Sequence, residues 1–123
     1  MHTSVLMSLY SGTKPEELSV TLDSIRTQSS PASEIIVVLD GPVSTAVRNC
    51  LAKFTLQLPI RVTSLQTNSG LGIALAHGLL MCTYNYIFRV DSDDICLPNR
   101  FHSQIEYLKA NPNTAVLGGA LKE

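Results

Sequence analysis

Three aspartates lie within four residues of the chain, at Asp91, Asp93 and Asp94. They directly follow the apolar run 86–90, which predicts a strand that ends at a concentration of negative charge. Hard divalent cations such as Mg²⁺ or Mn²⁺ take carboxylate oxygens as ligands, often together with the phosphates of a substrate. Aspartate is also a favoured turn and helix-capping residue, so the cluster by itself is compatible with a metal site or with a capping turn.

Other cation- or phosphate-binding motifs do not account for this cluster. An EF-hand loop counted from Asp91 would need glycine at its sixth position and glutamate at its twelfth, where the chain has Cys96 and His102. The chain contains no GxxxxGK(S/T) phosphate loop, and no GxGxxG follows its first predicted strand. Without such glycines, the charge of a bound diphosphate would have to be met by a metal ion, for which the acidic cluster supplies ligands.

Short apolar runs alternate with helical patterns along the chain. Five runs predict strands, and four stretches with apolar residues three or four positions apart predict helices between them. The predicted strands lie at residues 5–9, 35–39, 60–65, 84–90 and 115–117. The second is a continuous β-branched run, which fits a strand buried on both faces. This order predicts one α/β domain over residues 1–123, with a Rossmann-like, mainly parallel sheet and helices on both faces.

Individual residues indicate where the predicted helices begin and end and how one of them packs. Residues 13–16 match a capping box at the start of the first helix, and Gly78 would let the third helix approach the sheet closely. Pro98 predicts the start of the fourth helix, and Asn111-Pro112 predicts its end.

Polar or permissive residues follow each of the first four predicted strands. They are Ser8 and Tyr10, then Asp40, then Asn68 and Gly70, and finally the aspartate cluster. Because ligands of open α/β sheets bind outside the carboxyl ends of the strands, these residues are expected along one rim. Connecting loops are commonly rich in such residue types, which accounts for most of the positions singly. Loop composition explains Asp40 less well, because this acid stands at the end of the wholly apolar second strand.

The composition argues against some classes of function. The chain has 123 residues, of which 45% are hydrophobic and 15% charged, so it can form a real core. The formal net charge is −1 and no basic stripe is present, which argues against a nucleic-acid-binding surface. Three cysteines without a CxxC pair or histidines at ligand spacing predict buried, reduced thiols rather than a zinc site.

Targeting signals are not recognisable in the sequence. No apolar run approaches the roughly 20 residues that a membrane-spanning helix needs. The N-terminus lacks a charged leader followed by a cleavage site. We therefore expect a cytoplasmic protein that works there or at the inner face of the membrane.

Several segments match known motifs in order and at appropriate spacing. They are 5–10, Ser24-Ile25 with Gln28, 34–41, Asn68 with Gly70, Ala74 and Gly78, and Asp91, Asp93 and Asp94 with Pro98 and Arg100. Together they resemble the family 2 glycosyltransferases of the GT-A fold, which are inverting enzymes that use nucleotide-diphosphate sugars. The pattern resembles bacterial enzymes of polysaccharide biosynthesis. The chain departs from the family pattern at Ser8, Leu39 and His77, where proline, a second acid and asparagine are common.

The resemblance implies roles for the residues that follow the strands. The nucleotide-sugar site would comprise Ser8, Tyr10, Asp40, Asn68, Gly70 and Asp91, and the metal site would comprise Asp91 and Asp93. Ser8 and Tyr10 would line the base pocket, and Asp40 would hydrogen-bond the base, which is expected to be uracil. Asp91 and Asp93 would correspond to the family's DxD pair, holding the ribose and a diphosphate bound to Mg²⁺ or Mn²⁺.

The resemblance also implies the reaction and its partners. A sugar would pass from a nucleotide-diphosphate donor, expected to be a UDP-sugar, to a saccharide or lipid-linked acceptor. An inverting transfer needs a general base within hydrogen-bond reach of the acceptor hydroxyl, and no acid of this chain is a convincing candidate. Family members usually continue well beyond this length, so we expect the donor-binding half of such an enzyme, with weak or no transfer activity alone. Apolar surface would then stay exposed and favour self-association. The alternatives are a non-catalytic nucleotide- or metal-binding module and an inactive remnant.

Overall fold

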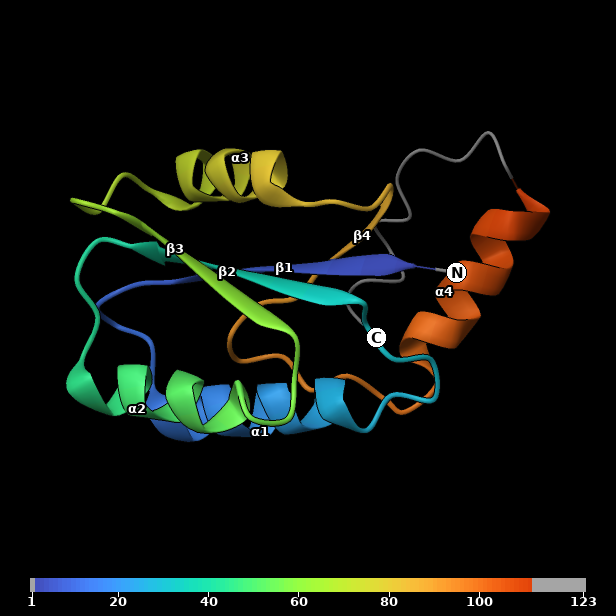
Figure 1. Ribbon diagram of the computed structural model, residues 1–123, viewed down its shortest axis with the longest axis horizontal. Coiled ribbons are helices and arrows are strands. Elements are labelled where there is room, and N and C mark those ends of the chain that lie inside the picture. Colours follow the sequence, from blue (N-terminus) through green and yellow to red (C-terminus); the bar gives the residue numbers. More distant parts are fainter. Residues whose placement is uncertain (1, 112–123) are drawn as a thin grey trace.

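The computed structural model describes residues 2–111, in which four strands alternate with four helices (Figure 1). The strands are β1 (Thr3–Leu9), β2 (Glu34–Asp40), β3 (Ile60–Leu65) and β4 (Tyr86–Arg89). The helices are α1 (Pro15–Arg26), α2 (Thr45–Phe54), α3 (Leu71–Met81) and α4 (Arg100–Ala110). The predicted alternation is confirmed over these elements, while the strand predicted at residues 115–117 lies outside the described residues.

The four strands form one sheet in the order β3-β2-β1-β4, and every pair is parallel. Every residue of β2 is buried, as its continuous apolar sequence predicts. The register brings the carboxyl ends of the strands level, because Leu9 pairs with Leu39 and Asp40 pairs with Leu65. Strand β4 runs parallel to β1 and ends at Arg89, which pairs with Leu6, so the chain continues from there toward the same edge. The residues that follow the strands therefore leave the sheet along one rim.

Helices cover both faces of the sheet, with α1 and α2 on one side and α3 on the other (Figure 1). Alternate residues of β1 serve the two cores, since successive side chains of a strand point to opposite faces. Val5 and Met7 belong to the larger core beneath α1 and α2, whereas Leu6 belongs to the smaller core beneath α3. Stacking of Phe88 on Phe101, with ring centroids 4.4 Å apart, joins β4 to α4. The predicted fold class is confirmed.

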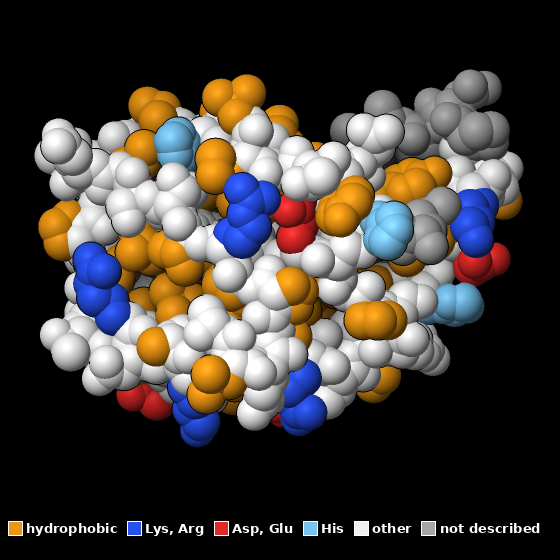
Figure 2. All heavy atoms as spheres, viewed as in Figure 1, with side chains coloured by type: hydrophobic (Ala, Val, Ile, Leu, Met, Phe, Trp, Pro, Cys, Tyr) orange, Lys and Arg blue, Asp and Glu red, His pale blue; other side chains and the backbone are white. Residues whose placement is uncertain are grey.

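Helix α3 contains no charged residue and is apolar nearly all round. Such a helix is usually buried on every side, but here only one side meets the sheet. Its outer side forms an apolar surface, visible in the upper part of Figure 2. The exposed side chains are Leu71, Ile73, Leu79 and Leu80. The exposed apolar surface expected from the sequence is thus present, and the self-association that it would favour stays a prediction.

Gly78 lets α3 lie directly on the sheet, as predicted. A Cβ there would meet Leu6 Cδ1 at 2.5 Å and Val38 Cγ2 at 2.6 Å. We expect Gly78→Ala to lower the free energy of unfolding by about 1 kcal/mol, because overpacking outweighs alanine's better helix propensity. Urea denaturation measures this change. Gly72→Ala in the same helix is the control, since nothing lies within 4 Å of a Cβ at that position. Equal stability changes in the two variants would contradict the role assigned to Gly78.

The start of α1 differs from the predicted capping box. The helix begins at Pro15, so Lys14 is the N-cap residue, and no side chain caps it. Proline favours the first helical position because it has no N–H to satisfy, and this shifts the N-cap one residue beyond Thr13. Thr13 Oγ1 instead accepts a hydrogen bond from the Tyr10 N–H at 3.0 Å. Helix α4 likewise begins two residues later than predicted, at Arg100.

The three cysteines are all free, but they differ in burial. Cys96 is buried, whereas Cys50 and Cys82 are only partly buried. The prediction of buried thiols is therefore right for Cys96 and wrong in degree for the other two, which lie in or at the end of helices that have one side open to solvent. Their partial burial raises the pKa of both thiols, which keeps them protonated at neutral pH.

Candidate functional site

A cavity of about 460 Å³ lies at the carboxyl edge of the sheet. It is lined by Ser8, Tyr10, Gly12, Thr13, Glu17, Asp40, Asn68, Gly70, Leu71, Asp91, Ser92 and Asp93. Every residue predicted for the nucleotide-sugar and metal sites is in this set. The parallel register brings them together from four separate stretches of the chain, as expected for a site at the ends of parallel strands.

Tyr10 forms one wall of the cavity, directly after β1. Its backbone is fixed by a tight turn in which the Thr13 N–H donates to the Tyr10 carbonyl at 3.1 Å. The ring lies over Gly12, where an added Cβ would come within 2.6 Å of the ring atoms. Tyr10 is about half exposed, so part of its ring surface is available to a planar ligand.

Asp40 is the buried end of β2 and fixes the loop after β3. Its Oδ1 accepts the Ser69 N–H at 2.7 Å, and its Oδ2 accepts the Gly70 N–H at 3.1 Å. Gly70 has a φ of 98°, which favours glycine. Gly41, at φ 82°, lies so near this loop that a Cβ would meet the Asn68 nitrogen at 2.7 Å. Asp40 therefore shapes the cavity floor through two backbone hydrogen bonds.

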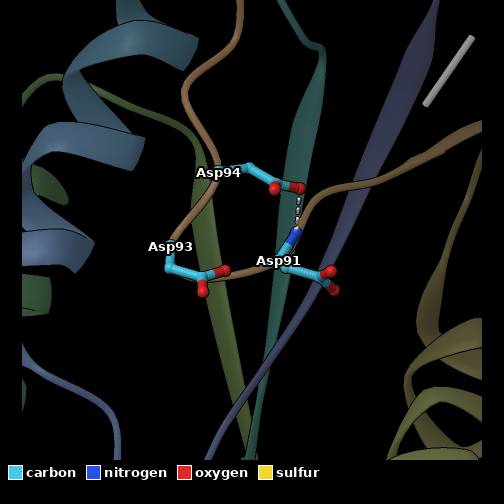
Figure 3. Close-up of side chains that lie close together, drawn as sticks. All are labelled: Asp91, Asp93 and Asp94. Carbon is cyan, nitrogen blue, oxygen red and sulfur yellow. Dashed lines mark hydrogen bonds between the residues drawn. The ribbon is translucent and has the colours of Figure 1, made fainter. Parts of the chain in front are cut away.

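The three aspartates follow β4, and their carboxylate oxygens lie within 4.8 Å of one another (Figure 3). Asp94 Oδ2 accepts the Asp91 N–H at 3.0 Å, the dashed line in Figure 3, and the Asp94 N–H donates to the Asp91 carbonyl at 3.0 Å. Asp91 Oδ1 pairs with Arg89 at 3.1 Å. Within the described residues, no hydrogen bond or ion pair involves the Asp93 carboxylate.

This geometry bears on the capping interpretation of the cluster. Asp94 does act as a turn residue, but it closes the turn of the cluster itself rather than capping the next helix, which begins only at Arg100. Asp91 and Asp93 line the cavity. Three clustered carboxylates provide an all-oxygen donor set, which fits a hard divalent cation and not a soft metal.

Residues 90–99, which join β4 to α4 and carry the three aspartates, form what we call the acidic segment. Arg100 anchors the far end of this segment. Its side chain is buried, with Nη1 donating to Cys96 Sγ and Nη2 donating to the Arg89 carbonyl, each at 3.2 Å. These contacts tie the end of β4 to the start of α4. Arg100 lies outside the cavity lining, so its part is to hold the backbone on which the acids are carried.

Sequence reasoning missed several lining residues, of which Thr13, Glu17 and Ser92 are polar. Glu17 lies in the first turn of α1, and the amino end of a helix that follows a parallel strand lies at the same edge as the strand's carboxyl end. Its place directly after β1 was therefore an available signal. Asp94 was seen in the cluster but not assigned to the site, although its oxygen is close enough to join the other two at a cation.

A family model described as glycosyl transferase family 2 matches residues 4–123 of the chain. The chain belongs to glycosyl transferase family 2. The resemblance recognised in the sequence motifs is confirmed.

Two curated relatives match this family 2 chain over 98% of its length. The amylovoran biosynthesis glycosyltransferase AmsE of Erwinia amylovora is 44% identical over 120 residues. The UDP-Gal:alpha-D-GlcNAc-diphosphoundecaprenol beta-1,3-galactosyltransferase of Escherichia coli is 33% identical over 120 residues. The chain spans less than half of each relative, 45% of the first and 44% of the second.

Solved structures of transferases share the fold of this family 2 chain. S. aureus TarS 1–349 in complex with UDP-GlcNAc superimposes with a TM-score of 0.77 and 25% identity, over 89% of this chain and 32% of TarS. The mannosyltransferase PcManGT from Pyrobaculum calidifontis, in complex with GDP-Man and Mn²⁺, gives a TM-score of 0.77 at 17% identity, over 87% of this chain and 32% of its own. In residues 2–111, no helix is long and apolar enough to cross a membrane.

Proposed function

We propose that this chain binds a nucleotide-diphosphate sugar as the donor part of a glycosyltransferase. A UDP-sugar is the proposed donor, and a saccharide or lipid-linked sugar is the proposed acceptor. Ser8 and Tyr10 would contact the base, with Asp40 beneath it. Asp91 and Asp93 would hold a Mg²⁺ or Mn²⁺ ion together with the diphosphate.

The observation that carries this proposal is the shared cavity. Tyr10, the loop fixed by Asp40, and the carboxylates of Asp91 and Asp93 come from different strands and line one space of about 460 Å³. An aromatic ring suits a planar base, exposed backbone and amide groups suit a ribose, and clustered carboxylates suit a cation bound to phosphates. No single one of these features would specify the ligand. In the strand order β3-β2-β1-β4, however, the Asp40-fixed loop and Tyr10 lie together on one side, where they would hold the nucleoside, and the acids follow β4 on the other side, where they would meet the diphosphate.

Relatives support the donor and acceptor classes. A UDP-galactose-using enzyme is 33% identical, and TarS, at 25% identity, has been solved with UDP-GlcNAc. The first of these relatives takes a lipid-linked sugar diphosphate as its acceptor. We therefore favour uridine over other nucleosides and a sugar over a protein as the acceptor.

The chain's own residues would orient the donor for transfer. Stacking on Tyr10 and contacts at the Asp40-fixed loop would hold the nucleoside, so that the sugar extends past the acids toward the open side of the cavity. A bound divalent cation would neutralise charge on the departing diphosphate. The general base that activates the acceptor is not assigned to any described residue.

Titration of the chain with UDP, with and without Mn²⁺, tests the proposal. Isothermal calorimetry should show UDP binding that becomes at least about tenfold tighter when Mn²⁺ is present, because the cation bridges the acids and the diphosphate. GDP should bind more weakly than UDP under the same conditions. A folded sample that binds no nucleoside diphosphate, or binds UDP equally well with and without Mn²⁺, would contradict the proposal.

A further inference from the structure

The segment that joins β4 to α4 carries the acids but contains no helix or strand of its own. Its backbone groups therefore need partners from elsewhere in the fold. Several of these partners come from α1 and the turn just after it. They are the side chains of Thr21, Ser24 and Gln28, which we call the polar stripe of α1.

Thr21 holds the backbone on both sides of Asp93. Its Oγ1 lies 2.9 Å from the Ser92 carbonyl oxygen and 2.6 Å from the Asp94 carbonyl oxygen. A threonine hydroxyl has a single proton to donate, so the two carbonyls share it. The side chain is fully buried, although it is polar and lies on the helix that supplies Leu18 and Leu22 to the main core.

The rest of the polar stripe continues along the same segment. Ser24 Oγ accepts the Cys96 N–H at 3.0 Å and donates to the Thr21 carbonyl at 2.7 Å. Gln28 Nε2 donates to the Leu97 carbonyl at 2.6 Å, while its Oε1 accepts the Phe101 N–H at 3.0 Å. The polar stripe, whose residues are three and four positions apart and whose last member follows α1, thus accompanies the acidic segment as far as the first turn of α4.

We propose that Thr21 and Ser24 are positioning residues for the cation, acting through the backbone that carries Asp91 and Asp93. The proposal rests on the cation and nucleotide site proposed above. By fixing the carbonyls that flank Asp93, Thr21 holds the acids at one separation before any ligand arrives. A preorganised set of carboxylates binds a cation more tightly, because the acidic segment does not have to be ordered when the cation binds.

The test compares Thr21→Val with the wild-type chain and with Thr21→Ser. Valine keeps the shape of threonine but cannot donate, whereas serine restores the hydroxyl. In calorimetric titrations with UDP, the Mn²⁺ concentration that gives half of the metal-dependent tightening should rise about tenfold in Thr21→Val. It should return close to the wild-type value in Thr21→Ser. The affinity for UDP without metal should stay unchanged in all three proteins.

A control separates positioning from a general loss of stability. Leu51→Ala removes core volume from α2 on the same side of the sheet and leaves the hydrogen bonds of the polar stripe to the acidic segment in place, so it should destabilise the chain without changing the Mn²⁺ requirement. Ser24→Ala, which removes the acceptor for the Cys96 N–H, gives a second test if Thr21→Val does not fold. It should raise the Mn²⁺ requirement in the same direction.

The outcomes distinguish the two proposals. If wild-type UDP binding responds to Mn²⁺ but Thr21→Val and Ser24→Ala need no more Mn²⁺ than wild type, the positioning role is wrong and the donor site stands. An equal rise in Leu51→Ala would also overturn it, since the effect would then follow stability. If wild-type binding does not respond to Mn²⁺ at all, the donor-site proposal and the positioning role both fail.

Discussion

An Asp93→Ala variant is expected to lose the Mn²⁺-dependent part of UDP binding while keeping the wild-type fold. Asp93 is exposed and, within the described residues, its carboxylate makes no hydrogen bond or ion pair, so its removal leaves no partner unsatisfied. It lines the cavity and belongs to the acidic cluster, so its removal takes one ligand from the proposed cation site. We expect UDP affinity in the presence of Mn²⁺ to fall by the whole metal-dependent tightening, at least about tenfold, equivalent to about 1.4 kcal/mol or more.

The measurement is calorimetry with UDP at saturating Mn²⁺, together with thermal denaturation to confirm folding. Asp23→Ala is a matched control, because it removes another exposed aspartate, which lies on α1 outside the cavity and pairs only with Arg26 among the described side chains. It should bind UDP as the wild type does. Unchanged Mn²⁺-dependent binding in Asp93→Ala would remove Asp93 from the metal site.

Among the charged side chains of residues 2–111, Glu34 is expected to contribute most to the free energy of unfolding. It lies at the opposite edge of the sheet from the cavity, at the start of β2, and it is buried. Its carboxylate accepts the hydroxyl of Ser4 at 2.6 Å, the hydroxyl of Thr83 at 3.0 Å, the Thr83 N–H, and Arg61 Nη1 at 3.1 Å. Glu34 thus connects β1, β3 and the segment before β4. Replacement with glutamine should cost about 2–3 kcal/mol at neutral pH, because these donors lose a charged acceptor.

The pH dependence of stability follows from the same contacts. Burial alone would raise the pKa of Glu34, but the hydrogen bonds from Ser4, Thr83 and Arg61 outweigh it and lower the pKa from its ordinary value. The unfolded chain then binds a proton more readily than the folded one. The stabilisation by Glu34 is therefore complete above the pKa of a glutamate in the unfolded chain, about 4.3. It is lost as the pH falls through the lower pKa of Glu34 in the folded chain.

Urea denaturation between pH 7 and pH 3 measures this effect. The wild type should lose stability as the pH falls below about 5, and Glu34→Gln should lose less, so that the two curves converge in acid. Glu106→Gln is the matched control, because Glu106 is exposed and its pair with Lys109 on α4 is open to solvent. A pH-independent difference between the wild type and Glu34→Gln would show that the carboxylate charge is not the cause.

The predicted elements agree best where the signal is local. The continuous apolar run of β2 specified a buried central strand because only a strand with both faces covered tolerates it. The capping box failed because two local signals competed at one helix start, and the preference of Pro15 for the first turn prevailed over Thr13 as a cap. Asp40, Asp91 and Asp93 were predictable because they lie at or just after the end of an apolar strand, and the carboxyl ends of parallel strands share one rim.

The sequence by itself determined the family, the alternation of strands and helices, and most of the residues that line the cavity. Hydrophobic periodicity and the polar ends of strands are local, and the parallel order then brings those ends to one rim. Tertiary structure alone decided what Asp40, Asp94 and Thr21 do. Asp40 holds the Ser69–Gly70 backbone, Asp94 closes its own turn, and Thr21 reaches carbonyls about 70 positions away in the chain. These hydrogen bonds depend on which backbone groups packing leaves without partners, and no local pattern in the sequence records that.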